Sequence, residues 1–260
     1  MSYLDFFAQN CLRYIPKTKL ESKRVLVVGC GHGQDCQAFV GAKVIHGIDI
    51  CQHIGRDFSH PSVSYFSESA EAMERSSDEY DLVFSVAVLE HIHNLAAALA
   101  EIVRVTKPGG LIYTVASPLW NSLEGHHYND LFSDYPWAHL RLTPDAMKHW
   151  LVTSKTHEDF QPWLDLLEKE GFLSEPILDK DIYNYAQRIT DFLFSDYFNR
   201  TPAKQYCDEV NKLDLSYLIR NDLWYNHSET LTPEILSELS SKGLTKEELL
   251  SVSHTFVGIK

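Results

Sequence analysis

Three closely spaced glycines follow a short apolar run near the N-terminus. The run at 25–28 contains only valine and leucine, and Gly29, Gly31 and Gly33 come next, ahead of a helix-compatible stretch. Glycines bring the backbone close to a ligand, and the N–H groups of the following helix add positive charge there. About twenty residues after Gly29, a second apolar run reaches Asp49, whose carboxylate can accept both hydroxyls of a ribose. Together these features predict a bound cofactor that contains adenosine.

The glycine spacing disfavours a nicotinamide dinucleotide as that cofactor. The dinucleotide fingerprint has its third glycine three positions after the second. That position is Gln34 in this chain, and the glycine falls at Gly33 instead. An ordinary tight turn is the structural alternative, and the acid at Asp49 makes that alternative weaker.

Histidines after the fifth apolar run could move protons. His126, His127 and His139 lie in this segment, and imidazole titrates near neutral pH. Each could act as a general base that takes the proton of an oxygen or nitrogen acceptor. Each could equally be an exposed or structurally bonded histidine. A divalent metal held with Asn129 and Asp130 is a further alternative, but we expect no resident metal.

A zinc site is also disfavoured. The candidate ligands would be Cys30, Cys36, Cys51 and His53, yet no Cys-x-x-Cys pair occurs and Cys30 lies inside the glycine loop.

Large aromatic side chains and one arginine accompany the histidines. We predict Trp120, Trp137 and Arg141 as acceptor-binding residues, with the Arg141 guanidinium clamping a carboxylate or phosphate. The alternative for Arg141 is support of the loop from outside. The many aromatic residues between 183 and 225 could form a lid over the acceptor, the core of a helical insertion, or a dimer contact.

The remaining pattern predicts the elements that hold these residues. Strand-like runs alternate with helix-compatible segments, which is typical of a parallel sheet covered on both faces. The predicted strands are 25–28, 44–50, 63–66, 80–86, 111–115, 172–178 and 253–259, and the predicted helices are 3–15, 34–40, 68–75, 94–105, 159–171, 181–200, 203–221 and 233–242. The fold class is therefore α/β: a Rossmann-like, doubly wound, mostly parallel sheet of about seven strands with a helical insertion or lid.

We divide the chain accordingly. Residues 1–118, with about 172–178 and 251–260, form the cofactor-binding core. Residues about 119–171 and 179–250 supply the acceptor-binding loop and helical elaborations.

Composition limits the partners and the compartment. The chain has 23 Lys and Arg against 36 Asp and Glu, which gives a net charge of −13 at pH 7. Such a surface repels nucleic acid and anionic membranes on average. Five cysteines are an odd number in a chain too long to need disulfides, and no basic leader or long apolar run is visible. We expect a cytoplasmic protein with no membrane or nucleic-acid partner.

Residues 25–115 resemble the core of the class I S-adenosylmethionine-dependent methyltransferases, of the methyltransferase type 11/12-like kind. The resemblance rests on short motifs in a specific order and spacing: Val25-Leu26-Val27-Val28-Gly29-Cys30-Gly31-His32-Gly33, Ile48-Asp49, Ser69-Ala70-Glu71, Tyr80-Asp81-Leu82-Val83-Phe84-Ser85, Val88-Leu89-Glu90-His91-Ile92 and Lys107-Pro108-Gly109-Gly110. It implies S-adenosyl-L-methionine as the cofactor.

The resemblance also implies roles for single residues. The residues that it places around the cofactor are Gly29, Cys30, Gly31, Gly33, Asp49, Ile50, Ser69, Ala70, Val86 and Leu89. Two positions depart from the family: an acid is common where Val27 stands, and an aspartate where Ser69 stands. Asp35 is a candidate to replace the first of these acids. The segment that contains His91 is more often architectural in this family, so His91 ranks below the later histidines.

These observations favour a methyltransferase that acts on a small-molecule acceptor, with O-methylation slightly preferred because of the histidines. A nicotinamide-dependent oxidoreductase and a non-catalytic S-adenosylmethionine-binding partner protein are the alternatives. A homodimer is left open.

Overall fold

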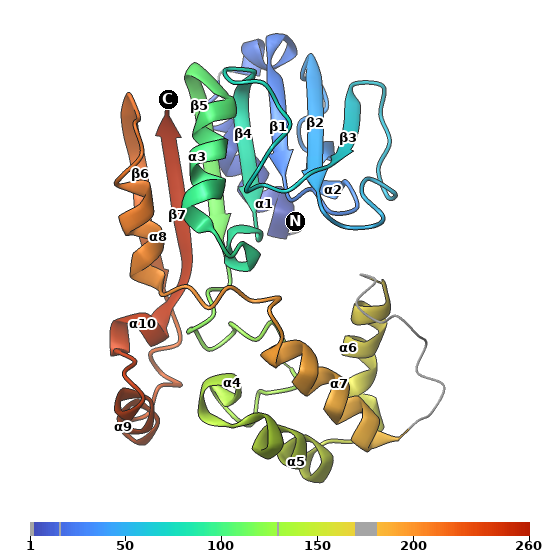
Figure 1. The fold of residues 1–260 in the computed structure, drawn as a ribbon, viewed down its shortest axis with the longest axis vertical. Coiled ribbons are helices and arrows are strands. Elements are labelled where there is room, and N and C mark those ends of the chain that lie inside the picture. The colour runs from blue at the N-terminus through green and yellow to red at the C-terminus, as the bar shows by residue number, and fades with distance from the viewer. Residues whose placement is uncertain (1–2, 16, 129, 170–180) are drawn as a thin grey trace. The chain divides into compact units, whose positions relative to one another are not determined.

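The computed structural model describes residues 3–15, 17–128, 130–169 and 181–260. Its centre is a seven-stranded sheet in the order β3-β2-β1-β4-β5-β7-β6 (Figure 1). The strands are β1 (Arg24–Val28), β2 (Val44–Asp49), β3 (Val63–Ser67), β4 (Tyr80–Val86), β5 (Thr106–Ala116), β6 (Tyr217–Tyr225) and β7 (Ser251–Ile259). Strands β1 to β5 pair in parallel, and β7 runs antiparallel to β5. The predicted Rossmann-like α/β fold is therefore confirmed.

The chain divides into two compact units. The first contains the residues up to Ser117, Thr201–Trp224 and Ser253–Lys260, and the second contains Pro118–Arg200 and Tyr225–Val252. The stretch Thr201–Trp224 thus belongs to the first unit, although the sequence analysis grouped it with the elaborations.

Apolar residues on both faces explain the central strands of the first unit. Val25, Leu26, Val27 and Val28 of β1 have no exposed surface, as expected for a parallel strand covered on both sides. Their register with β2 places Val25 opposite Ile45.

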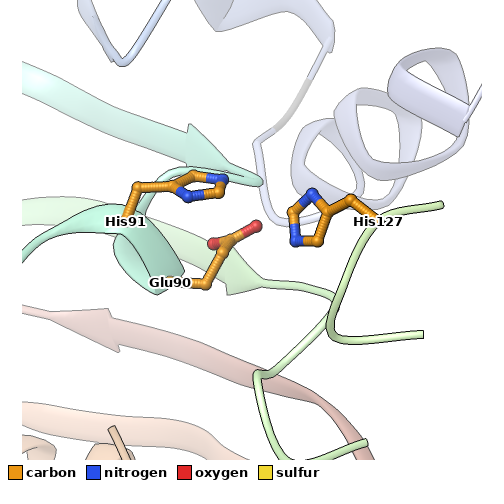
Figure 2. A group of neighbouring side chains, drawn as sticks. All are labelled: Glu90, His91 and His127. Carbon is orange, nitrogen blue, oxygen red and sulfur yellow. The ribbon is translucent and has the colours of Figure 1, made fainter. Parts of the chain in front are cut away.

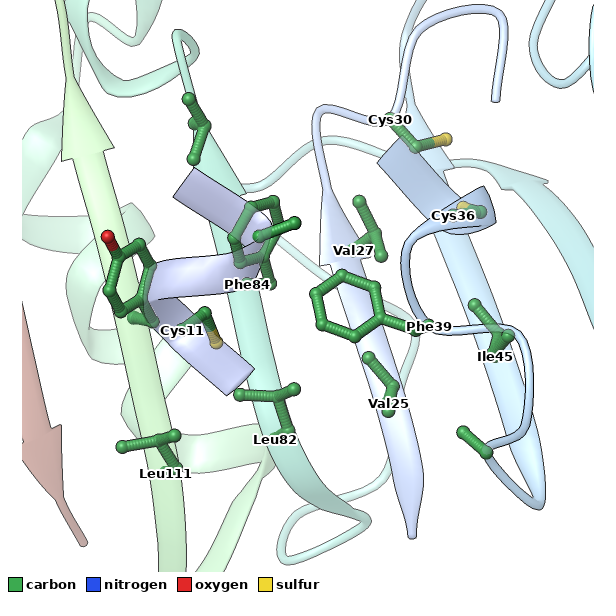
Figure 3. Close-up of a cluster of buried hydrophobic side chains, with 14 of the residues drawn as sticks. Cys11, Val25, Val27, Cys30, Cys36, Phe39, Ile45, Leu82, Phe84 and Leu111 are labelled. Atoms are coloured by element: carbon green, nitrogen blue, oxygen red, sulfur yellow. The ribbon is translucent and has the colours of Figure 1, made fainter. Parts of the chain in front are cut away.

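One face of the sheet carries the cluster drawn in Figure 3, in which Phe39 meets Phe84 edge to face with ring centroids 5.0 Å apart. This face is covered by α1 (Tyr3–Leu12), whose Cys11 is fully buried in the cluster. The other face is covered by α3 (Leu95–Val105), which Asn94 caps by accepting a hydrogen bond from the Ala97 N–H.

The second unit is built from helices around its own aromatic core. Its helices are α4 (Ala138–Arg141), α5 (Pro144–Ser154), α6 (His157–Lys169), α7 (Ile182–Phe194), α9 (Pro233–Ser241) and α10 (Lys246–Leu250). Phe132, Phe160 and Tyr185 are among its buried residues. None of the described helices in either unit has the length and apolar character that a bilayer-crossing segment needs.

Several predicted elements differ from the observed ones. The helix predicted over 203–221 is correct only for α8 (Ala203–Val210), and β6 begins at Tyr217. No helix forms at 68–75, and the helix after the glycine loop, α2 (Gln34–Gln37), is a single turn. The strand predicted at 172–178 lies outside the described residues, and the described sheet ends at β6, which the sequence analysis did not predict.

Candidate cofactor and acceptor site

The glycine loop follows β1 at the point where the strand order of the sheet reverses. Strands β2 and β4 lie on opposite sides of β1, so the carboxyl ends of β1 and β4 frame the crevice where open α/β sheets bind ligands. A Cβ on Gly29 would overlap the side chain of Val88, which follows β4. Gly31 has φ +49° and nothing within 4 Å of its Cβ position. Gly29 therefore lets the two strand ends approach each other, and Gly31 presents bare backbone to open space.

Asp49 ties the glycine loop to the end of β2. Its Oδ2 accepts a hydrogen bond from the Gly31 N–H at 2.8 Å, and its Oδ1 accepts one from the Cys51 N–H at 2.9 Å. Each carboxylate oxygen has a second lone pair, so the group can still accept from two ribose hydroxyls. The next residue, Ile50, is 78% exposed, which offers an apolar surface beside this carboxylate.

The loop also packs against β2 through two thiols. A Cβ on Gly47 would meet Cys30 Sγ at 2.7 Å and Cys36 Sγ at 3.0 Å. Both cysteines are buried, and burial and the neighbouring thiol raise the pKa of Cys30 far above its ordinary value. All five cysteines are free thiols, and Cys30 and Cys36 serve here as small core side chains.

Asp35, in α2, is a buried carboxylate that lacks a partner. Its side chain is 8% exposed, and no hydrogen bond reaches its Oδ1. Burial, with a smaller contribution from the charge of Asp49, raises the pKa of Asp35 to about 7. A buried carboxylate is stable in its charged form only when a cation or donors face it. The loop is therefore short of positive charge, as expected for a site that takes a cationic ligand.

The remaining predicted cofactor residues lie on the neighbouring strand ends. Ser69 is exposed after β3, and its Oγ accepts a hydrogen bond from the Glu71 N–H at 3.2 Å, while Ala70 is half-buried. Val86 ends β4, Leu89 begins the short helix η2 (Leu89–His91), and both are buried.

Sequence analysis did not single out Glu90 as a site residue. Figure 2 shows Glu90 and His91 on η2; the third labelled side chain, His127, belongs to the second unit. Glu90 is 2% exposed, and neither carboxylate oxygen has a hydrogen-bond partner. Burial raises the pKa of Glu90 to about 8; the nearby N–H groups of Glu90 and Ser117 oppose the shift, but neither is aligned well enough to form a hydrogen bond. Glu90 is thus largely protonated at neutral pH. In the sequence, only the position of Glu90 shortly after a buried strand could have indicated that its carboxyl group is buried.

Two of the predicted catalytic histidines are buried side by side in the second unit. The rings of His126 and His139 lie 5.1 Å apart. His126 Nδ1 accepts a hydrogen bond from the Tyr128 N–H at 2.8 Å, and His139 Nε2 donates to the Trp120 carbonyl at 2.7 Å. Burial lowers the pKa of His126 well below its ordinary value and that of His139 to about 4. Both imidazoles are therefore neutral at pH 7 and poor proton acceptors.

His127 has a different environment from these two. Its backbone has φ +63°, and its half-buried ring meets Phe198 edge to face at 5.2 Å. Among the three predicted bases, His127 is the least buried, although its Nε2 is enclosed by the protein. Asn129, the neighbouring metal-ligand candidate, lies outside the described residues.

Two predicted acceptor-binding residues have structural partners instead. Trp137 is fully buried, and its Nε1 donates to the Asn121 carbonyl at 3.2 Å. Arg141 forms an ion pair with Glu238 of α9, Nε to Oε2 at 2.9 Å. Trp137 thus has no exposed surface and the Arg141 charge is paired, and contact of either residue with the acceptor stays a prediction.

Trp120 is also mostly buried. Its ring meets the His139 ring edge to face at 4.8 Å, and the Arg200 guanidinium lies 5.2 Å from its ring centroid. It stays a predicted acceptor-binding residue, and it contacts His139 of the buried histidine pair through both its ring and its backbone carbonyl.

Comparison with known proteins agrees with this geometry. Residues 26–114 match the family model described as a methyltransferase domain. The chain is 26% identical over 177 residues to a ubiquinone biosynthesis O-methyltransferase of Bradyrhizobium sp. strain ORS 278, which covers 62% of this chain and 66% of that protein. It is 31% identical over 101 residues to a protein of the same name from Rhizobium johnstonii, which covers 36% of this chain and 41% of that protein. The chain thus matches less than two thirds of the length of either relative.

The fold recurs among solved structures. An S-adenosylmethionine-dependent methyltransferase from Mesorhizobium loti superposes with a TM-score of 0.52 at 14% identity, over 99% of this chain and all of the other. At that identity the likeness concerns the fold. The open space at Gly31 and the unpartnered carboxylate of Asp35 fit a cofactor that carries a sulfonium and an ammonium group. Residues 26–114 thus carry a methyltransferase domain, and the sheet order and the glycine loop with Asp49 support a class I methyltransferase that uses S-adenosylmethionine.

Proposed function

We propose that this protein transfers the methyl group of S-adenosylmethionine to an oxygen atom of a small-molecule acceptor. The observation that carries the proposal is the acidic, cation-deficient loop around Gly31, where Asp35 and Asp49 lie close enough for one charge to raise the pKa of the other. The relatives are named as ubiquinone biosynthesis O-methyltransferases, which supports an oxygen acceptor.

The first unit would hold the cofactor. Asp49 would accept the ribose hydroxyls while it keeps its bonds to the Gly31 and Cys51 N–H groups. Asp35 would face the cationic methionine part, and Ile50 would lie against the adenine. The bound cofactor supplies an activated methyl group with a good leaving group, so the protein's own task is to align the acceptor and remove its proton.

Within the second unit, His127 is the best candidate for removing that proton. Burial lowers the pKa values of His126 and His139, which makes both rings poor proton acceptors, whereas His127 is only half-buried. His126 and His139 would then stabilise the conformation of the segment after β5 through their hydrogen bonds to its backbone. We further propose that the second unit selects the acceptor.

The remaining expectations stay proposals. The net charge of −13 supports a small-molecule partner over nucleic acid, and the free cysteines support a reducing, cytoplasmic setting. A homodimer is compatible with β6, the exposed strand at the edge of the sheet.

Calorimetry followed by a methyl-transfer assay would test the function. We expect S-adenosylhomocysteine to bind and NAD not to bind, and labelled methyl to pass to a phenol or catechol in a panel that also holds amines, thiols and carbon acids. Binding of NAD alone would make the protein an oxidoreductase. Binding of S-adenosylhomocysteine without transfer to any acceptor class would favour a non-catalytic binding protein.

A further inference from the structure

Strand β6 is the last strand of the sheet and leaves apolar side chains in solvent. In the described part of the chain it has β7 on one side and no strand on the other (Figure 1). Tyr217 is 66% exposed, Trp224 56% and Leu218 40%. An edge of this kind presents backbone N–H and C=O groups to any further strand, and such edges are usually covered or interrupted.

Asn221, at the middle of β6, fixes how the strand sits on its own protomer. Its Nδ2 donates to the Cys207 carbonyl and to Asn211 Oδ1, both at 3.0 Å, and its Oδ1 lies 2.8 Å from His254 Nε2. Side chains alternate between the faces of a strand. The anchored Asn221 therefore places Arg220 and Asp222 together on the opposite face.

Arg220 and Asp222 form an exposed ion pair there. The Arg220 Nε donates to Asp222 Oδ1 at 3.0 Å and its Nη2 donates to Oδ2 at 2.6 Å. Their side chains are 45% and 48% exposed, so both retain donor and acceptor capacity toward solvent.

The sequence of β6 has the same character when read in either direction from Asn221. The nine residues are Tyr-Leu-Ile-Arg-Asn-Asp-Leu-Trp-Tyr. If two copies of the strand lie antiparallel about a two-fold axis at Asn221, each side chain meets a complementary one. Arg220 then faces Asp222, Ile219 faces Leu223, and Leu218 faces Trp224. Directly opposed side chains of this kind are about 5 Å apart and stabilise a strand pair.

We propose that β6 is a homodimer interface: a second copy of this chain adds its own β6 antiparallel, in the register centred on Asn221. The resulting contact is isologous and closes after two subunits. The four central charges then alternate in sign, so the pairing is specified by charge. A parallel pairing would instead place Arg220 opposite Arg220, which disfavours it.

The net charge does not prevent this pairing at ordinary salt. Each copy carries −13, but at about 0.15 M ionic strength charges are screened beyond about 8 Å. The cross-strand charges are closer than that, so they decide the outcome. A single strand pair is a small interface, and we therefore expect a dimer that dissociates on dilution.

Charge exchange within β6 tests both the interface and its register. Analytical ultracentrifugation of the full chain would follow the association from about 1 to about 200 µM. Arg220→Asp places two acids at the centre of each strand, and Asp222→Arg places two bases there. We expect each single variant to be monomeric over the whole range. An equimolar mixture of the two should form a heterodimer, and the double variant Arg220→Asp/Asp222→Arg should recover the homodimer.

Folding of each variant is checked by its melting curve and by its affinity for S-adenosylhomocysteine, since neither residue belongs to the cofactor site. A matched control is Lys212→Asp, which removes an exposed ion pair with Glu209 outside β6 and should leave association unchanged. A wild-type protein that stays monomeric throughout would overturn the proposal. So would single variants that still dimerise, or a double variant that fails to recover the dimer while folded.

Discussion

The region around the cofactor loop and the segment after β5 bury opposite kinds of titratable group. The first unit buries acids close to the strand ends that frame the cofactor site, where burial raises the pKa of Asp35 to about 7 and that of Glu90 to about 8. The second unit buries bases, where burial lowers the pKa of His126 and His139. In each case burial favours the neutral form. The acids lack partners that a cationic cofactor can supply, whereas each histidine already has a backbone partner.

This difference assigns the two units different responses to pH. An acid whose pKa is raised by folding contributes stability below its unfolded pKa, near 4, and loses it as the pH rises through 7 to 8. A histidine whose pKa is lowered contributes stability above its unfolded pKa of 6.5 and loses it as the pH falls toward 4. Mild acid should thus favour the local structure around Asp35 and Glu90 and disfavour that around His126 and His139. Burial also lowers the pKa of His254 in the first unit, so the surroundings of that residue should respond as the buried histidines of the second unit do.

The largest effect that would separate the units is a loss of turnover without a loss of cofactor affinity. If His127 removes the acceptor proton, His127→Gln should lower kcat about 10²–10⁴-fold, while affinity for S-adenosylhomocysteine stays near wild type. His149→Gln, an exposed histidine on α5, is the matched control and should keep full activity. Full activity of the His127 variant would show that the acceptor needs no base at this position.

The pH response gives the next largest effect. Between pH 7 and pH 4, His139 should cost the second unit about 3 kcal/mol of stability, from its shift of more than two pKa units. Hydrogen exchange, corrected for the intrinsic rate at each pH, should show protection falling in the 118–154 segment and not in α2, which carries Asp35. His139→Gln can still donate to the Trp120 carbonyl and should reduce this fall. Equal losses in both units would contradict the comparison.

In the first unit, Asp49→Ala should weaken S-adenosylhomocysteine binding by about 1–3 kcal/mol, because the ribose hydroxyls lose a charged acceptor. The loop N–H groups of Gly31 and Cys51 also lose their acceptor, so the melting temperature has to be measured alongside. Affinity that survives the substitution would place Asp49 outside the site.

The smallest effect concerns the protonation state of Asp35. A cation that binds beside a carboxyl with a pKa near 7 lowers that pKa, so about half a proton should leave the protein when S-adenosylmethionine binds at pH 7. Calorimetry in buffers of different ionisation enthalpy measures this number. Asp35→Asn should abolish the release, whereas Asp57→Asn, a loop acid already bonded by Gln34 at 2.9 Å, should not. Identical proton counts in all three proteins would exclude Asp35 from contact with the cation.

The sequence was sufficient to predict the parts whose signal is local. Continuous apolar runs fixed β1 and β4, and the glycines with Asp49 located the cofactor loop, because both depend on residues close in the chain. Strand β6 was missed because Arg220, Asn221 and Asp222 interrupt its apolar pattern, and their pairing with each other, α8 and β7 is visible only in three dimensions.

The same limit applies to the candidate site. Trp137 and Arg141 have residue types typical of ligand contacts, yet their partners Asn121 and Glu238 are distant in sequence. Burial decides the behaviour of His126, His139 and Glu90, and burial is a property of the folded chain. Residue type therefore indicated which groups could do chemistry, and only packing distinguished His127 from its buried neighbours.

The rate at which the thiols beneath the glycine loop react with a probe reports how often that loop opens. Cys30 and Cys36 are buried against Gly47, whereas Cys51 and Cys207 are half-buried. A thiol-reactive probe should therefore modify Cys51 and Cys207 before the three buried thiols, and Cys30 and Cys36 only when the loop separates from β2. Peptide mapping distinguishes these two from Cys11, which is buried on the inner side of α1. Counting modified cysteines over time by mass spectrometry would yield the free energy of that local opening in the native protein. Bound cofactor should slow the modification of Cys30 and Cys36, the thiols that react late because the loop must open first.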